Sequence, residues 1–101
     1  MAKTSKVVKN GKREHLVDKY RQRRDELRAR SIDPKCSLEE RMEARAALAQ
    51  LPRNGAAVRV RNRCLITGRP RGFSRRLGIS RVMVRTLAHQ GVLPGLSKAS
   101  W

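Results

Sequence analysis

The stretch RNRCLITGRPRGFSRRLGISRVM, residues 61–83, contains the spacing that decides the fold of this chain. It places a single cysteine, Cys64, among arginines, glycines and a proline. Three interpretations fit such a stretch: half of a metal site, a loop that binds nucleic acid, or an ordinary basic surface. The spacing around the cysteine and the charge of the whole chain help to distinguish between them.

A four-cysteine zinc ribbon holds its metal on two tight turns, each usually Cys-x-x-Cys. Here Cys64 is followed three positions later by Thr67. After twelve further residues, Ser80 is followed three positions later by Met83. This is the spacing of a zinc ribbon in which three ligands are replaced. Because hydroxyls are poor zinc ligands and a thioether is soft and uncharged, we predict that no metal is bound. On spacing alone, Cys64 can equally be an ordinary buried cysteine.

The composition points to a polyanionic partner. The 101 residues carry 25 Lys+Arg against 8 Asp+Glu, a formal net charge of +17. All acidic residues lie between Glu14 and Glu43, whereas the chain from Pro52 onward has eleven Lys+Arg, ten of them Arg, and no acid. Arginine presents a planar fork of donors that matches phosphate and stacks on bases. A face needed only for solubility would mix both signs, so we predict nucleic-acid binding, with an anionic membrane as the second candidate.

The length limits the fold to one small domain, and the scarcity of large apolar side chains predicts a weak core. We therefore expect the free chain to be loosely folded and to need a partner to hold its shape. No nucleophile–base pair, paired carboxylate site or nucleotide-binding glycine loop is present. The sequence thus predicts neither an enzyme nor a small-molecule substrate.

Several features favour a cytoplasmic location. The opening residues lack the apolar core of a signal peptide, and no apolar run approaches the ~20 residues of a membrane span. The two cysteines, Cys36 and Cys64, do not make the disulfide framework of a small secreted domain.

Three segments have helical patterns: two precede the quoted stretch, and the third begins at its end. Residues 13–31 bring apolar side chains near one face, and Asp33-Pro34 ends the pattern. SLEE at 37–40 is a capping box for a second helix that Pro52 stops. We expect its apolar face, formed by Leu38, Met42, Ala46 and Ala49, to pack on the first helix. Residues 79–90 form the third helix, with Ser80 as its N-cap and Gly91 as its left-handed stop.

The remaining segments lack clear periodicity. Residues 1–12 carry a lysine at every third position, which fits either a flexible or a partly helical arm. Residues 53–78 are an arginine-rich loop, with short strands expected around 58–66. We expect Gly68, Gly72 and Gly78 to let the backbone approach phosphates and donate its amides to them.

The quoted stretch closely resembles the bacterial small-subunit ribosomal protein fourteen family, in which TGRPRG at 67–72 and the ending KASW are specific signals. The resemblance extends over the full length, including the opening MAKTSK and the LPRN turn at 51–54. That family has a short form with two Cys-x-x-Cys zinc knuckles. Its longer form lacks most of these ligands and has an inserted helical segment. This chain is similar to the longer form, so the resemblance supports the degenerate zinc-site interpretation without implying a metal.

The resemblance implies a structural constituent of the small ribosomal subunit. Such a protein binds small-subunit ribosomal RNA in the head, beside ribosomal proteins three, ten and nineteen, and supports head assembly. A DNA-binding or DNA-condensing protein is the alternative, because the third helix could enter a major groove. A zinc nuclease lacks the necessary ligand cluster. A membrane-active peptide is disfavoured because the one clearly amphipathic helix is not the most basic segment.

The fold expected from these arguments is mainly α with irregular, extended segments: N-terminal helices, then a degenerate zinc-ribbon-like module without metal. Its parts are a basic arm and helix (1–32), an inserted helical segment (33–57) and an arginine-rich RNA-binding module (58–101). We expect no cofactor. The degenerate ligand positions are Cys64, Thr67, Ser80 and Met83. The expected RNA-binding residues are Lys3, Lys6, Lys9, Lys12, Arg53, Arg59, Arg61, Asn62, Arg63, Thr67, Gly68, Arg69, Arg71, Gly72, Arg75, Arg76, Ser80, Arg81, Arg85, Lys98, Ser100 and Trp101.

Overall fold

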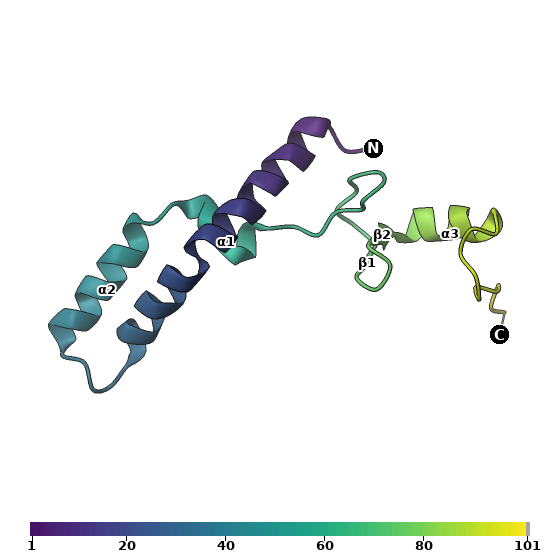
Figure 1. Cartoon of the computed structure of the whole chain (residues 1–101). Helices are drawn as coiled ribbons and strands as arrows, with labels where there is room; N and C mark the ends of the chain where they lie inside the picture. The colour runs from purple at the N-terminus through teal and green to yellow at the C-terminus, as the bar shows by residue number, and fades with distance from the viewer. Residues whose placement is uncertain (101) are drawn as a thin grey trace. The chain divides into compact units, whose positions relative to one another are not determined.

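The computed structural model describes residues 1–100 and is mainly helical (Figure 1). Its elements are α1 (Thr4–Ile32), α2 (Leu38–Gln50), the short 3-10 helices η1 (Arg53–Gly55) and η2 (Ala57–Arg59), the strands β1 (Phe73–Ser74) and β2 (Ile79–Ser80), and α3 (Arg81–His89). The rest is extended or irregular, so the predicted mainly α class is confirmed. The chain divides into two compact units: residues 9–60, and residues 1–8 together with the chain from Arg61 onward.

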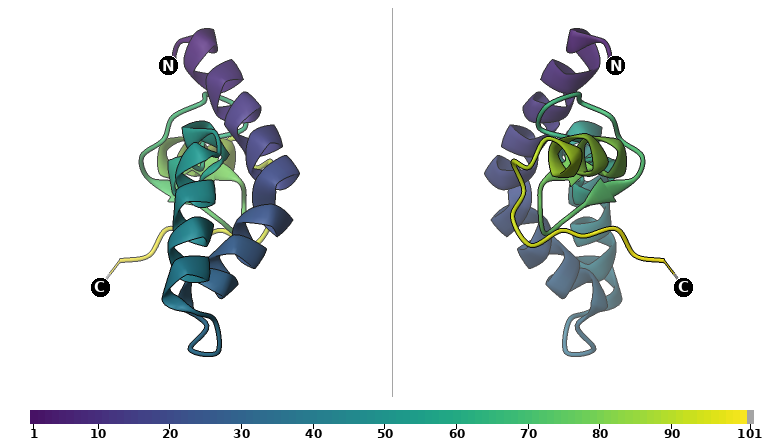
Figure 2. Two further views of the ribbon diagram at one scale, coloured as in Figure 1. Left: turned by 90° about the vertical axis from the view of Figure 1, so that its left-hand side faces the viewer. Right: turned by 90° about the vertical axis from the view of Figure 1, so that its right-hand side faces the viewer.

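The unit of residues 9–60 contains most of α1 and all of α2, which run antiparallel beside one another (Figure 2). α1 ends at Ile32, as the Asp33-Pro34 pair predicts, because a residue before proline avoids the helical conformation. At the start of α2, Glu40 N donates to Ser37 Oγ at 3.2 Å and Ser37 N donates to Glu40 Oε2 at 3.0 Å. These bonds satisfy an amide of the first helical turn and that of the capping residue, so the predicted capping box is confirmed.

α2 does not pack through the face that its sequence predicts. The residues of that face are Leu38, Met42, Ala46 and Ala49, and all four are exposed. The buried residue of α2 is Ala44, with Leu48 half-buried on the same side. The prediction failed because alanines occur on most sides of this helix, so its pattern is too even to choose a face. A small side chain such as Ala44 also lets two helices approach closely.

Two arginines of α1 hold the chain that follows α2. Arg24 Nη2 donates to the carbonyl of Pro52 at 2.7 Å, and Arg13 Nη1 donates to the carbonyl of Arg59 at 3.3 Å. Gly55 is buried against α1, where an added Cβ would lie 3.4 Å from the ring of Tyr20. This segment therefore forms two 3-10 turns pinned to α1.

The strands expected around 58–66 are absent from that segment, and the prediction is wrong. The two-stranded sheet lies later in the chain, with Phe73 opposite Ser80 and Ser74 opposite Ile79. A strand needs a partner, and in the described residues the paired strands are the two that flank the turn ending at Gly78. Gly78 closes that turn with φ +68°, and its amide donates to the carbonyl of Ser74 at 2.8 Å.

α3 follows β2 directly in the unit that contains the arginine-rich loop (Figure 1). Ser80 is the N-cap, as predicted, although its side chain makes no capping hydrogen bond. Gly91 has φ +72°, which confirms the predicted left-handed stop. Between its ends, α3 exposes Arg81 and Arg85.

The basic opening of the chain is largely helical. α1 begins at Thr4, so the partly helical alternative describes residues 1–12 correctly. Asn10 is buried, and its amide donates to Glu14 Oε1 at 2.8 Å. None of the helices described in residues 1–100 has the length and apolar character needed to cross a lipid bilayer.

Candidate nucleic-acid interface

The arginine-rich loop contains a closed turn around Cys64. Gly68 N donates to the carbonyl of Cys64 at 2.8 Å, and Cys64 N donates to the carbonyl of Arg69 at 3.0 Å. Arg63 Nη1 adds a bond to the carbonyl of Gly68 at 2.9 Å. Gly68 has φ +69°, a conformation that residues with a Cβ rarely adopt. The turn is therefore fixed by its own backbone and one arginine.

The Cys64 sulfur lies in a nest of hydrogen-bond donors. Cys64 is only 3% exposed. Burial alone would raise the pKa of its thiol, but donors stabilise the thiolate more strongly and lower the pKa from its ordinary value of 9.0 to about 6. These donors are the hydroxyl of Thr67 and the backbone amides of Thr67, Ser80 and Ile66. Segments separated by more than twelve residues thus meet at one sulfur.

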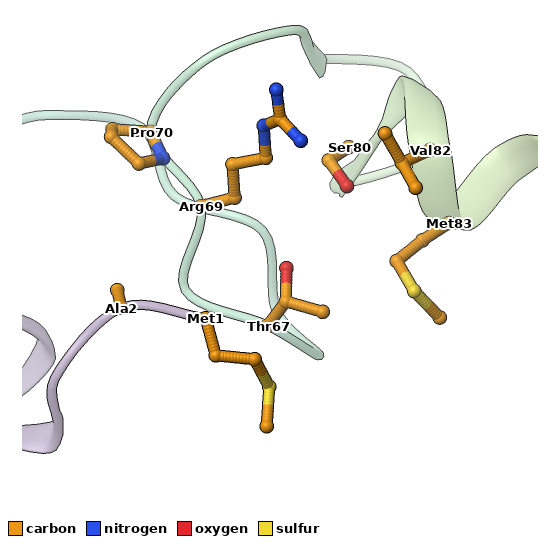
Figure 3. Close-up of a pocket in the computed structure, with 8 residues that line it drawn as sticks. All are labelled: Met1, Ala2, Thr67, Arg69, Pro70, Ser80, Val82 and Met83. Carbon is orange, nitrogen blue, oxygen red and sulfur yellow. The ribbon is translucent and has the colours of Figure 1, made fainter.

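The other degenerate ligand positions gather at a neighbouring hollow. Figure 3 shows Thr67, Ser80 and Met83 around this hollow of about 430 Å³, which Met1 and Arg69 also line. Within residues 1–100, Thr67 Oγ1 and Ser80 Oγ are buried without a well-aligned hydrogen bond. The Thr67 hydroxyl is nevertheless close enough to the Cys64 sulfur to favour the thiolate.

This donor set does not suit zinc. One thiolate, two hydroxyls and a thioether replace the four thiolates of a zinc ribbon, and only the thiolate is a good zinc ligand. In the described part of the chain, no three His, Cys, Asp or Glu side chains gather as a metal site would require. The residues therefore provide no basis for a metal-dependent step.

Most of the expected RNA-binding side chains are exposed. The exposed ones are Lys3, Lys6, Lys9, Lys12, Arg53, Arg61, Asn62, Arg69, Arg71, Gly72, Arg75, Arg76, Arg81, Arg85, Lys98 and Ser100. Arg59, Arg63 and Thr67 are half-buried, and Gly68 and Ser80 are buried. The prediction for Trp101 lies outside the described residues. The exposed bases from Arg61 onward share a unit that contains no Asp or Glu, so no carboxylate side chain of that unit neutralises them.

The C-terminal segment and α3 form a second basic hollow. This segment, drawn in yellow, turns back after α3 and lies beside it (Figures 1 and 2). Arg85 and His89 of α3 and Lys98 of the segment line a hollow of about 480 Å³, together with apolar residues such as Val84 and Leu96. Its apolar lining and basic rim suit the face of a nucleobase and its phosphate.

Two similarities to known proteins bear on this interface. A family model described as ribosomal protein S14p/S29e matches residues 47–100. The small ribosomal subunit protein uS14A of Mycobacterium ulcerans (strain Agy99) is 55% identical over all of this chain and all of its own length. The chain belongs to the ribosomal protein S14p/S29e family. The uS14 proteins of Beijerinckia indica subsp. indica and Methylorubrum extorquens (strain PA1) are 55% and 52% identical, again over the full length of both chains.

The family match covers the arginine-rich loop, the turn around Cys64 and α3, whereas most of α2 lies outside the matched residues. The family resemblance inferred from TGRPRG and KASW is thereby confirmed. The matched residues thus include almost all of the acid-free segment from Arg61 onward, together with residues 47–60 of the other unit, and leave α1 and most of α2 outside the match.

Two details of the family region differ from the sequence-based expectation. The amide of Gly68 donates to Cys64 and that of Gly78 donates to Ser74, so neither is free to bind phosphate as expected. Arg63 already donates to a backbone carbonyl within the loop. These bonds help to shape the loop, whereas the side chains of neighbours such as Arg69 and Arg71 are exposed.

Further exposed basic residues lie on α1, beyond those predicted to bind RNA. Arg21 and Arg23 are exposed, as is Lys19, whose ammonium lies 5.7 Å from the ring centroid of Tyr20. Neighbouring Arg13 and Arg24 serve the fold instead. Helical periodicity could have signalled Arg21, which lies away from the apolar stripe. It could not have signalled Arg23, which lies three residues after Tyr20 and four before Leu27 and so on the side of the stripe.

Proposed function

We propose that this chain is a structural constituent of the small ribosomal subunit that binds small-subunit ribosomal RNA. The observation that carries the proposal is the composition of one compact unit. Residues 1–8 and the chain from Arg61 onward contain eleven Lys+Arg and no Asp or Glu. Like charges at this density repel one another unless a polyanion neutralises them. Membership of the ribosomal protein S14p/S29e family supports ribosomal RNA as that polyanion.

The proposed mechanism is neutralisation and moulding of folded RNA, with no chemistry on a substrate. Exposed guanidinium groups such as those of Arg71, Arg75 and Arg76 can bind phosphates in pairs of hydrogen bonds and stack on splayed bases. Arg81 lies at the N-terminus of α3, where the helix dipole adds to its attraction for an anion. These contacts would hold the RNA around the loop.

The finer assignment rests on the resemblance of the sequence to the longer family form. In this assignment the chain lies in the head of the small subunit, contacts ribosomal proteins three, ten and nineteen, and takes part in assembly of the head. A cytoplasmic location follows if the protein is a bacterial ribosomal component. The proposed parts of the chain remain an arm with helix (1–32), an inserted helical segment (33–57) and an RNA-binding module (58–101).

The RNA-binding module is proposed to be a zinc ribbon that keeps its shape without metal. The approach of Thr67 and Ser80 to the Cys64 sulfur supports this, because a metal ribbon would bring its two turns together in the same way. The test is to replace Thr67, Ser80 and Met83 by cysteine and measure bound zinc by native mass spectrometry. We expect one zinc ion per chain. In a matched control, cysteines replace Ile66, Arg81 and Val84 instead. Equal zinc binding by both variants, or none by the first, would refute the ribbon geometry.

The proposal is tested against the DNA-binding alternative by direct competition. The purified chain is mixed with labelled head-region ribosomal RNA, and unlabelled RNA or duplex DNA of equal length competes for it. We expect RNA to compete at least tenfold better. If about eight phosphates are neutralised, the log-log salt dependence of RNA affinity should have a slope of about −6 to −7. Equal competition by DNA would favour the alternative.

A further inference from the structure

One exposed side of α2 combines apolar residues with acidic neighbours. Its apolar members are Leu38, Met42, Ala46 and Ala49, and these four residues are the α2 stripe. We propose that the α2 stripe is a docking surface for a basic protein neighbour rather than for RNA. The inference rests on the proposed function in one respect: the partner is taken to meet the chain within the assembled small subunit.

The α2 stripe is exposed, whereas Ala44 on the opposite side of α2 is buried. Leu38 is 67% exposed and Met42 is 60% exposed, one helical turn apart. The helix buries Ala44 on its opposite side, so the stripe is not needed to hold α2 in its own unit. Apolar side chains gathered on one exposed helix face are typical of protein contacts. The RNA backbone would stabilise these side chains little, because its phosphates and sugars are polar and bury little apolar surface against them.

One edge of the stripe carries charge that disfavours RNA, whereas exposed Arg45 lies along the other edge. Residues 33–50 contain four acids and three bases, in a chain whose formal net charge is +17. Glu39 and Glu43 flank the stripe along one edge and are exposed. Carboxylates repel phosphates and attract lysine and arginine. The electrostatic complement of this edge is therefore a basic protein surface.

A groove beyond the acidic edge shows how such a partner could be held. It has a volume of about 520 Å³ and lies between α1 and α2. Its lining combines the carboxylates of Glu40 and Glu43 with apolar Leu27, Ala44 and Ala47. A lysine or arginine of the partner fits this combination, because its apolar stem can lie on the apolar lining while its charged end meets the carboxylates. Arg30 at the same groove limits the attraction but leaves two acids against one base.

The first test uses charge reversal. Glu43→Lys changes the acidic edge in the middle of α2, away from the capping box, and Asp18→Lys makes the same change at an exposed position of α1. Each purified chain is incorporated into small subunits reconstituted without the natural chain, and its affinity for naked ribosomal RNA is measured separately. We expect Glu43→Lys to lower incorporation about tenfold, Asp18→Lys to leave it unchanged, and neither to weaken binding to naked RNA. Higher incorporation of Glu43→Lys, parallel to a higher RNA affinity, would overturn the inference.

The second test identifies what covers the stripe. A photoreactive amino acid replaces Met42 or Ala46, and in a control it replaces Arg75 of the proposed RNA interface. After incorporation and irradiation, we expect protein crosslinks from Met42 and Ala46 and RNA crosslinks from Arg75. Crosslinks from the stripe to RNA, to a second copy of this chain or to nothing would refute the inference while leaving the proposed function intact. If the natural chain itself is not incorporated, both fail together.

Discussion

At the scale of single residues, hydrogen-bond donors from separate segments gather around the sulfur of Cys64. Its sulfur is buried, yet donors from Thr67, Ser80 and Ile66 favour the charged form and lower the pKa of the thiol to about 6. The thiolate would be the one negative side chain in a unit that contains no Asp or Glu. It can thus draw the two turns together, as a metal with cysteine ligands would.

The lowered pKa of Cys64 predicts a pH dependence of RNA affinity, because folding is expected to accompany binding. The thiolate contributes stability that is fully present above the ordinary pKa of 9.0 and is lost as the pH falls through about 6. RNA affinity should therefore weaken from pH 9 to pH 6 more strongly for the natural chain than for Cys64→Ser. Filter binding over this range measures the difference. Parallel pH profiles for the two chains would show that the thiolate has no such effect.

Gly68 gives a second prediction for a single residue. Its φ of +69° disfavours any other residue, and an added Cβ would lie 2.8 Å from Val7 Cγ2. Gly91 has a similar φ of +72° but open space around it. Gly68→Ala should weaken RNA binding about tenfold or more, and Gly91→Ala should weaken it less, because only backbone strain of about 1–2 kcal/mol applies there. Equal losses in an affinity titration would mean that the contact with Val7 does not matter.

At the scale of elements, the capping box makes α2 depend on local sequence. Ser37→Ala removes the acceptor for Glu40 N and should destabilise the helix by about 1 kcal/mol. We expect smaller helical Cα chemical shifts at residues 38–44 of the free chain. Ser97→Ala, an exposed serine outside the helices, provides the control. Unchanged shifts at 38–44 would show that tertiary contacts alone hold the start of α2.

The elements also show what the sequence can and cannot predict. Helix ends at Asp33-Pro34, Ser37 and Gly91 were predictable because each is set by the conformational limits of a few neighbouring residues. The packed face of α2 was not predictable, because alanines occur on most sides of the helix and no side is clearly more apolar than the others. The strands were misplaced because residues 53–78 lack clear periodicity, so no local signal showed which segments would pair. The targets of side chains such as Arg24 depend on tertiary packing and have no local signal.

At the scale of the whole molecule, little apolar surface is buried. Within residues 1–100, the buried apolar side chains are those of Ala44, Cys64 and Ile79. We therefore expect the free chain to melt gradually and to give poorly dispersed amide signals, with both changing when ribosomal RNA is added. Circular dichroism and amide spectra with and without RNA measure this. A cooperative transition and well-dispersed signals in the free chain would contradict the expectation.

The charge of the candidate interface could be predicted from the sequence, whereas the hydrogen bonds of its individual arginines could not. The acid-free arginine segment is visible in the sequence, and the structure leaves most of its bases exposed. The internal bonds of Arg59 and Arg63 were not visible, because composition does not separate a guanidinium that holds a loop from one that faces solvent. Family membership and acid-free charge together therefore carry the proposal more firmly than any single residue does.

The measurement that tests the central claim most directly is sedimentation of the tagged chain from a cell lysate through sucrose gradients at low and high salt. A structural constituent of the small ribosomal subunit should migrate with that subunit at low salt and remain with it after a high-salt wash. Protein found free at the top of the gradient or associated with DNA would contradict the account.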